Sequence, residues 1–179
     1  MTTGRERVRR SSLRFGDDAL SQVPVRIGDV KVASGHSLLF TIGLGSCVAV
    51  ALYDAHSNIG GLAHAMLPRP ERGHRDAPPG RFATTAIVQL IGLLKAEGAA
   101  PDRLRARLAG GASMFPDLLD RDGLQLGRRN IDAARATLQE QHIPIDGEDV
   151  FGTYGRSVFL RTSDGTLLVT SVEHDDVIL

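Results

Sequence analysis

The sequence has little of several residue types, and each shortage argues against a class of function. Its 179 residues include a single cysteine and no tryptophan, and aromatic residues make up only 4%. A lone cysteine cannot form an intrachain disulfide, so no oxidising compartment is required and we expect a cytoplasmic protein. So few aromatic rings give poor support for stacking on nucleic-acid bases. No run approaches the ~20 apolar residues of a membrane-spanning helix, so we expect neither nucleic-acid binding nor membrane insertion.

Charge is balanced over the whole chain but not along it. Lysine plus arginine and aspartate plus glutamate both number 21, and this zero net charge argues against a general polyanion binder. The first 20 residues, however, carry an excess of arginine. We expect residues 1–22 to form a flexible arginine-rich tail, with docking to an acidic partner as the open alternative. Residues 23–179 are expected to form a single domain.

Hydrophobic patterning predicts a domain that mixes strands and helices. Short apolar or alternating runs bounded by turn residues predict strands at 38–44, 47–53, 59–67, 105–108, 157–161 and 166–172. Residues 25–33 are interpreted as two short strands joined by a tight turn at Gly28-Asp29. Helical spacing predicts one helix over about 82–94 and a second helix capped by Asn130. This order favours an α/β (α+β) layered sandwich, with helices packed on the outside of mixed, largely antiparallel β-sheets.

The single cysteine, Cys47, lies between a glycine-containing bend and an apolar segment. The run reads Thr41-Ile-Gly-Leu-Gly-Ser-Cys47, and the segment after it is apolar on both faces, as in a strand covered on both sides. Gly45 and Ser46 allow a bend that exposes the sulfur and directs backbone N–H groups at an oxyanion. His64 follows on the next predicted strand as a candidate base, and Thr41 is a candidate to orient it.

Two interpretations of this cysteine stay open on the residues alone. A nucleophilic Cys47 with His64 as its base would be alkylated faster than free cysteine at neutral pH. The alternative is an inert, buried cysteine beside a structural histidine, which is common for such a small apolar side chain. One cysteine and six scattered histidines show no paired ligand spacing, so we expect no metal site.

Several segments of the chain resemble those of the CheD family of bacterial and archaeal chemotaxis proteins. The two signature segments are Thr41-Ile-Gly-Leu-Gly-Ser-Cys47-Val-Ala-Val and Gly61-Leu-Ala-His64-Ala-Met-Leu-Pro68. The resemblance covers most of the chain outside the tails and continues through Ala109-Gly-Gly-Ala-Ser-Met-Phe115, Leu126-Gly-Arg-Arg-Asn130, Glu148-Asp149 and Gly155-Arg156-Ser157-Val158.

This resemblance implies a chemoreceptor glutamine deamidase that needs no cofactor. Cys47 matches the nucleophile of the family, His64 its general base and Thr41 its third catalytic residue. The implied substrates are cytoplasmic helices of methyl-accepting chemotaxis receptors, and the implied regulatory partner is a CheC-type phosphatase. The implied fold is the layered sandwich of the cytotoxic necrotising factor deamidase domain. Hydrolysis of receptor methyl esters is a second activity open to the same acyl-enzyme route.

We also expect Ser46, Gly45 and Ser113 to contact the substrate or its oxyanion. One departure from the family lies at Phe151-Gly152, where two glycines are common; it implies a changed groove or a changed surface for the phosphatase. The alternative from another class of function is a non-catalytic chemotaxis adaptor that binds receptors and a CheC-type phosphatase.

Overall fold

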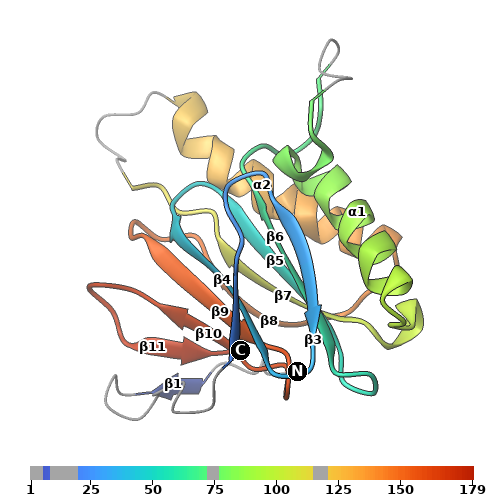
Figure 1. The fold of residues 1–179 in the computed structure, drawn as a ribbon. Helices are drawn as coiled ribbons and strands as arrows, with labels where there is room; N and C mark the ends of the chain where they lie inside the picture. Colours follow the sequence, from blue (N-terminus) through green and yellow to red (C-terminus); the bar gives the residue numbers. More distant parts are fainter. Residues whose placement is uncertain (1–5, 9–19, 72–76, 115–120) are drawn as a thin grey trace.

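The computed structural model describes residues 6–8, 20–71, 77–114 and 121–179. These residues form three layers: a six-stranded sheet, a five-stranded sheet, and two helices on the outer face of the five-stranded sheet (Figure 1). The layers confirm the predicted α/β sandwich with helices on the outside.

The six-stranded sheet has the strand order β1-β11-β10-β9-β4-β2. Its strands are β1 (Glu6–Val8), β2 (Ser21–Pro24), β4 (Ser37–Leu44), β9 (Arg156–Arg161), β10 (Leu167–Thr170) and β11 (Asp176–Ile178). β2 pairs parallel with β4, and the other pairs are antiparallel. β9 and β10 lie within or close to the strands predicted at 157–161 and 166–172, and they pair as an antiparallel hairpin.

The five-stranded sheet has the order β3-β6-β5-β7-β8. Its strands are β3 (Val30–Ser34), β5 (Val48–Asp54), β6 (Ile59–Ala65), β7 (Arg105–Gly110) and β8 (Ile145–Val150). Only the β7–β8 pair among these is parallel. Both sheets are therefore mixed and largely antiparallel, as predicted.

The two central strands of the five-stranded sheet are buried along their whole length. Every residue of β5 and of β6 is buried. Val48 and Val50 pack with the helices, whereas Ala49 and Ala51 pack in the core between the two sheets. This alternation follows from the two-residue period of a strand. It confirms that the segment after Cys47 is covered on both faces.

The two helices are α1 (Ala83–Ala96) and α2 (Arg121–Glu140), and they contact each other over the sheet. Two short 3-10 turns, Pro79–Arg81 and Pro101–Arg103, flank α1. Asn130 lies in the middle of α2 and does not cap it, so the predicted cap is wrong. Glycine is unfavourable in a helix interior, so Gly127 makes the first half of α2 hard to predict from the sequence. The helix needs a glycine there because a Cβ would lie 2.5 Å from the carbonyl oxygen of Gly111.

The segment over residues 25–33 differs from the prediction in two respects. It contains one strand and not two, because β2 ends at Pro24 before the segment begins. β2 and β3 are indeed joined by a tight turn, in which the Asp29 N–H donates to the Arg26 carbonyl over 2.9 Å and Gly28 has φ +83°. The two strands do not pair with each other, because the turn carries the chain from one sheet to the other. Near this crossing, the Gly28 N–H donates to the carbonyl oxygen of His64 over 2.7 Å.

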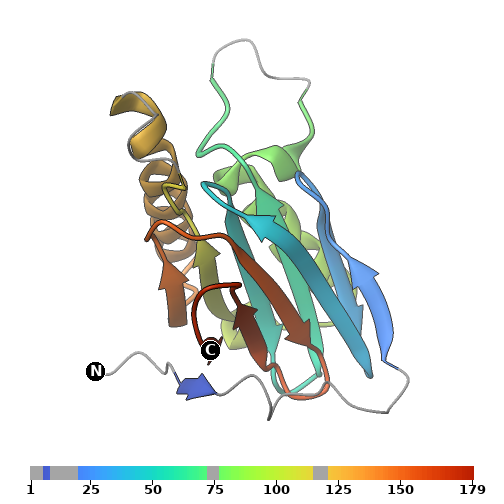
Figure 2. The same cartoon turned by 90° about the vertical axis from the view of Figure 1, so that its left-hand side faces the viewer.

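Part of the stretch predicted as a tail carries strand structure. Glu6–Val8 forms β1, which pairs antiparallel with β11 near the carboxyl end of the chain (Figure 2). β2 already begins at Ser21. Arg5 and the arginines at positions 9, 10 and 14 lie outside the described residues.

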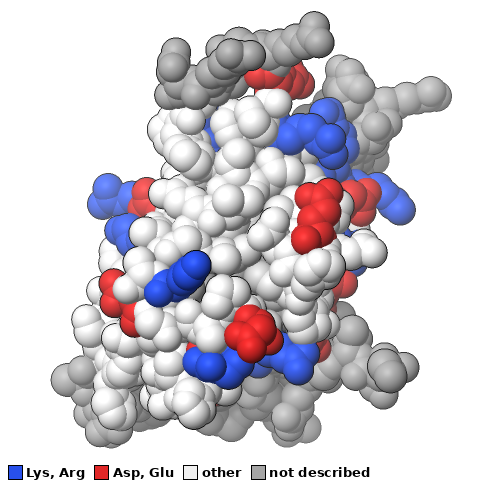
Figure 3. Space-filling view, turned by 90° about the vertical axis from the view of Figure 1, so that its right-hand side faces the viewer, with Lys and Arg blue, Asp and Glu red and all other residues white. Residues whose placement is uncertain are grey.

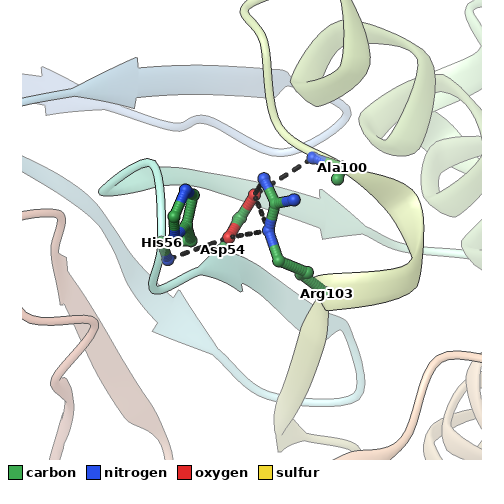
Figure 4. A network of polar contacts seen from close by, with 4 residues as sticks. All are labelled: Asp54, His56, Ala100 and Arg103. Atoms are coloured by element: carbon green, nitrogen blue, oxygen red, sulfur yellow. Dashed lines mark hydrogen bonds and ion pairs between the residues drawn. The ribbon is translucent and has the colours of Figure 1, made fainter.

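The end of β5 opposite Cys47 is held by a network of charged and polar contacts around Asp54 (Figure 4). This buried carboxylate accepts hydrogen bonds from the backbone N–H groups of His56 and Ala100 and from the guanidinium of Arg103, at distances of 2.8 to 3.2 Å. These bonds hold the pKa of Asp54 well below its ordinary value of 3.8. The network ties the sheet to the segment after α1.

Surface charges of both signs lie close together on the face shown in Figure 3, as expected for a chain of zero net charge. Within the described part of the chain, no helix is both long enough and apolar enough to cross a membrane.

Candidate active site

Thr41 and His64 belong to different sheets and meet in the layer between them. Thr41 lies on β4 and His64 on β6. Both side chains are buried, and Thr41 Oγ1 lies 2.7 Å from His64 Nδ1. The predicted contact between these residues is therefore present, and it is made through the threonine hydroxyl.

Cys47 directly precedes β5 and faces the same layer between the sheets. β5 and β6 are antiparallel neighbours in which Ala49 pairs with His64. Cys47 lies two residues before Ala49 and so occupies the same face, where a diagonal neighbour is about 7–8 Å away and within reach of a long side chain. Its half-buried side chain packs against the core between the sheets. The predicted adjacency of the two strands is confirmed.

Burial sets the protonation states of both groups. The pKa of His64 is lowered to about 4, chiefly because burial disfavours the imidazolium, with a smaller opposing effect of Asp29. Burial also raises the pKa of the Cys47 thiol, although a hydrogen bond from its own backbone N–H lowers it in part. At neutral pH the resting pair is thus a thiol and a neutral imidazole. A raised thiol pKa argues against alkylation faster than that of free cysteine, and this rate stays a prediction for experiment.

Glycines shape the segment between Thr41 and Cys47. The β4–β9 register shifts between Thr41 and Leu44, and Gly43 within this shift has φ +77°. A Cβ at Gly45 would lie only 2.8 Å from the sulfur of Met114. Glycine is required at the first position for its conformation and at the second because the Met114 side chain covers it.

The segment after β7 lies beside this bend and holds it by backbone hydrogen bonds. The Gly111 N–H donates to the Cys47 carbonyl over 2.7 Å, and the Ala112 N–H donates to the Gly45 carbonyl over 2.8 Å. The Ser113 N–H donates to the Gly152 carbonyl, while the buried Ser113 Oγ has no hydrogen-bond partner within the described part of the chain. Gly45 and Ser113 therefore lie on adjoining segments beside Cys47.

Asn130 is a residue of the site that the sequence interpretation missed. Its fully buried amide on α2 donates to the Ser46 carbonyl over 2.8 Å and to the Met66 carbonyl over 3.1 Å. The available signal was its position next to Ile131 on the buried face of the helix, where a polar side chain needs a partner.

Two cavities flank the bend that leads to Cys47. One, of about 480 Å³, is lined by Thr41 and His64 together with Ile27 and Ile42. The other, of about 900 Å³, is lined by Gly43, Met114 and residues 153–157 and 170–173, with Asp176. Among the described residues five large apolar side chains are exposed, and four of them line these cavities: Ile27, Ile42, Met114 and Val172. The surroundings of the site are thus unusually apolar for a surface.

Phe151 has φ +68°, a left-handed conformation that costs a bulky residue about 1–2 kcal/mol and costs glycine little. Its ring packs against the core under α2, with the guanidinium groups of Arg128 and Arg135 5.9 and 5.4 Å from the ring centre. These contacts offset the strain. The conformation explains why a glycine suits this position.

Phe115, the last residue of the segment Ala109-Gly-Gly-Ala-Ser-Met-Phe115, lies outside the described part of the chain. Among the described residues no group of three or more histidine, cysteine, aspartate or glutamate side chains is placed to hold a metal ion.

A cysteine beside a histidine that is oriented by a threonine, at the junction of two sheets, has the parts of a cysteine-dependent acyl-transfer site. Residues 66–171 match the family described as "CheD chemotactic sensory transduction", and the chain belongs to the CheD family. The matched range begins after His64 and includes Ser113, Asn130 and Phe151. The matched range does not include Thr41, Cys47 and His64, and the evidence for their roles is the geometry of these residues.

Curated relatives are similar over most of their length. A "Probable chemoreceptor glutamine deamidase CheD" from Caldanaerobacter subterraneus subsp. tengcongensis is 41% identical over 150 residues, or 84% of this chain and 93% of the relative. A "Probable chemoreceptor glutamine deamidase CheD 2" from Geobacter metallireducens is 43% identical over 153 residues, which cover 84% of this chain and 94% of the relative. The relative from Thermococcus kodakarensis is 37% identical over 157 residues, or 88% and 97%.

Solved structures match more distantly. The Neisseria meningitidis protein NMB0706 has a TM-score of 0.46 at 12% identity, over 89% of this chain and 75% of that one. YlmD from Geobacillus stearothermophilus has a TM-score of 0.45 at 14% identity, over 84% and 60%.

Proposed function

We propose that this protein deamidates glutamine side chains on the cytoplasmic helices of chemotaxis receptors, with Cys47 as the nucleophile. The observation that carries the proposal is the hydrogen bond between Thr41 and a buried, neutral His64 on the strand next to Cys47. Membership of the CheD family and the names of its relatives support the choice of glutamine as the substrate group.

The Thr41 contact is compatible with the histidine tautomer that the reaction needs, because the hydroxyl oxygen can accept from Nδ1–H. With Nδ1–H donating to Thr41 Oγ1, the other ring nitrogen, Nε2, carries a free lone pair. Nε2 of His64 is buried and has no hydrogen-bond partner among the described residues. It is the atom available to accept the proton of Cys47. Because the thiol rests protonated, proton transfer accompanies attack and does not precede it.

The reaction then proceeds through an acyl-enzyme. Cys47 Sγ attacks the carboxamide carbon as its proton moves to His64 Nε2, and the carbonyl oxygen becomes an oxyanion. Backbone N–H groups at Ser46 and Cys47 stabilise that charge. His64 returns the proton to the amide nitrogen, the C–N bond breaks and ammonia leaves. Water, deprotonated by His64, hydrolyses the thioester to a glutamate carboxylate and restores the thiol. An ester substrate follows the same steps with an alcohol as leaving group.

The surface around the site suits a protein helix as substrate. Ile27 and Ile42 are 57% and 67% exposed and line the same cavity as the buried Thr41 and His64. Exposed apolar side chains next to a site mark a surface that binds another protein. A CheC-type phosphatase is proposed to bind over the same region and restrain the activity.

The test is mass spectrometry of receptor cytoplasmic fragments after incubation with the protein. Each converted glutamine gains a small, defined mass, and Cys47→Ala abolishes the gain. Thr137→Ala serves as the control, because this buried hydroxyl on α2 donates to the Ala133 carbonyl of its own helix. Binding of the fragments with every glutamine unchanged would reject the enzyme in favour of an adaptor.

A further inference from the structure

Asn130 connects the two strands that carry the proposed nucleophile and base. Ser46, whose carbonyl accepts one amide hydrogen, immediately precedes Cys47. Met66, whose carbonyl accepts the other, comes two residues after His64. One side chain on α2 therefore fixes both segments of the five-stranded sheet at the point where they carry the site.

The orientation of this amide is determined by its surroundings. Both contacts of Asn130 are carbonyl oxygens, so the NH₂ group must face them; the flipped amide would place three acceptors together. Its Oδ1 is buried and has no hydrogen-bond partner in the described structure. A buried, unpaired acceptor destabilises the folded state, and asparagine is also a poor residue for a helix interior. Stability therefore does not explain why an asparagine occupies position 130.

The bond to Ser46 also determines where the next N–H group points. The described structure contains no cis peptide bond, and in a trans peptide the C=O and the following N–H point in opposite directions. Holding the Ser46 carbonyl towards α2 therefore directs the Cys47 N–H away from α2. That N–H is the group that contacts the Cys47 sulfur, and an oxyanion formed on attack would develop next to it.

The position of α2 itself does not depend on this amide. Ile131 is fully buried in the core under the helix, as are Ala134 and Leu138. Gly127 approaches Gly111 so closely that a Cβ would collide with its backbone. Removing the Asn130 side chain therefore leaves the helix held against the sheet.

We propose that Asn130 is a positioning residue that holds the Ser46–Cys47 peptide in the orientation in which its N–H stabilises the oxyanion, and that fixes this peptide relative to the His64 strand. This inference rests on the proposed deamidase function. It assigns the effect to the transition state, so it predicts a loss in kcat and not in KM.

The experiment compares Asn130→Ala and Asn130→Asp with Thr137→Ala, another buried polar position on α2. We expect kcat for receptor-fragment deamidation to fall about 100-fold in both Asn130 variants, with KM changed by less than about threefold, as for a lost oxyanion donor. Asn130→Asp keeps the side-chain volume and tests the proposal if the alanine variant does not fold. Thr137→Ala keeps kcat within about twofold. An Asn130 variant that folds and retains wild-type kcat, or that changes only KM, would overturn the proposal.

A second readout does not need deamidation at all. The pH dependence of Cys47 alkylation by iodoacetamide reports the thiol pKa, to which its own N–H contributes. We expect the midpoint to move to higher pH in Asn130→Ala and to stay in place in Thr137→Ala. Superimposable profiles for wild type and Asn130→Ala would contradict the positioning role. If the wild type deamidates nothing while Asn130→Ala still shifts the alkylation midpoint, the proposed function is rejected and the positioning role of Asn130 is supported.

Discussion

The two ends of strand β5 are built in opposite ways. Next to Cys47, three buried polar atoms have no hydrogen-bond partner among the described residues: His64 Nε2, Ser113 Oγ and Asn130 Oδ1. At the other end both carboxylate oxygens of Asp54 are satisfied by backbone and guanidinium donors (Figure 4). The strand between them is buried throughout.

This difference separates stability from function along one strand. Buried polar groups are ordinarily paired, because an unpaired one costs free energy on folding. The Asp54 carboxylate obeys this rule and ties the sheet to the segment after α1. The Cys47 end contains buried polar atoms that break it among the described residues, which is typical of a functional site. Variants at the two ends should therefore affect different properties.

The largest effect on stability is expected at the Asp54 end. Asp54→Ala removes the acceptor for two backbone N–H groups and for Arg103, and we expect a loss of about 3 kcal/mol in the free energy of unfolding. Asp164→Ala is the control, since its pair with Arg161 is half exposed and should contribute less than about 1 kcal/mol. Urea unfolding measures both. Equal losses in the two variants would contradict the special role of the buried network.

The catalytic end should lose stability first on acidification. His64 titrates near 6.5 in the unfolded chain and near 4 in the folded protein, so protons bind preferentially to the unfolded state between these values. Stability contributed by the neutral histidine is complete above about pH 6.5 and falls by on the order of 3 kcal/mol as the pH drops to about 4. Asp54, with its lowered pKa, keeps its contribution through this range and loses it only below its ordinary value of 3.8.

Urea unfolding of wild type and His64→Gln between pH 7 and pH 4 isolates the histidine. The wild type should lose more stability than the variant over this range. Parallel curves would show that His64 is not held neutral by the fold.

The smallest effect concerns substrate binding at the apolar surface. Ile42→Ser should raise KM for a receptor fragment about fivefold with kcat unchanged, because about 1 kcal/mol of apolar contact is lost. Val88→Ser is the matched control, since Val88 is similarly exposed on α1 and does not line either cavity. A change in kcat without a change in KM would place Ile42 in the catalytic step and not in binding.

Local patterns predicted much of the region around Cys47. Glycines and two alternating apolar runs were sufficient to predict that the Cys47 and His64 strands are neighbours. What escaped prediction depends on contacts between residues far apart in the chain. Asp54 binds Arg103 across a separation of 49 residues, and Asn130 binds Ser46 across 84. Contacts over such separations leave no periodic pattern in the sequence. The residues around Asn130 instead predicted a helix cap at this position.

The same limit applies to the strands before the site. The turn at Gly28-Asp29 was visible in the sequence, but it joins different sheets because β2 pairs with β4 and β3 with β6. Such pairing depends on the assembled layers and not on the residues of the turn.

The central claim is that a neutral, buried His64 takes the proton of Cys47 during attack. The pH dependence of kcat/KM for receptor deamidation tests it most directly, because this ratio reports groups of the free enzyme. We predict an acid limb with a pKa of about 4 and a plateau through neutral pH. An acid limb at 6.5 or above, or an unchanged rate in His64→Gln, would contradict the account.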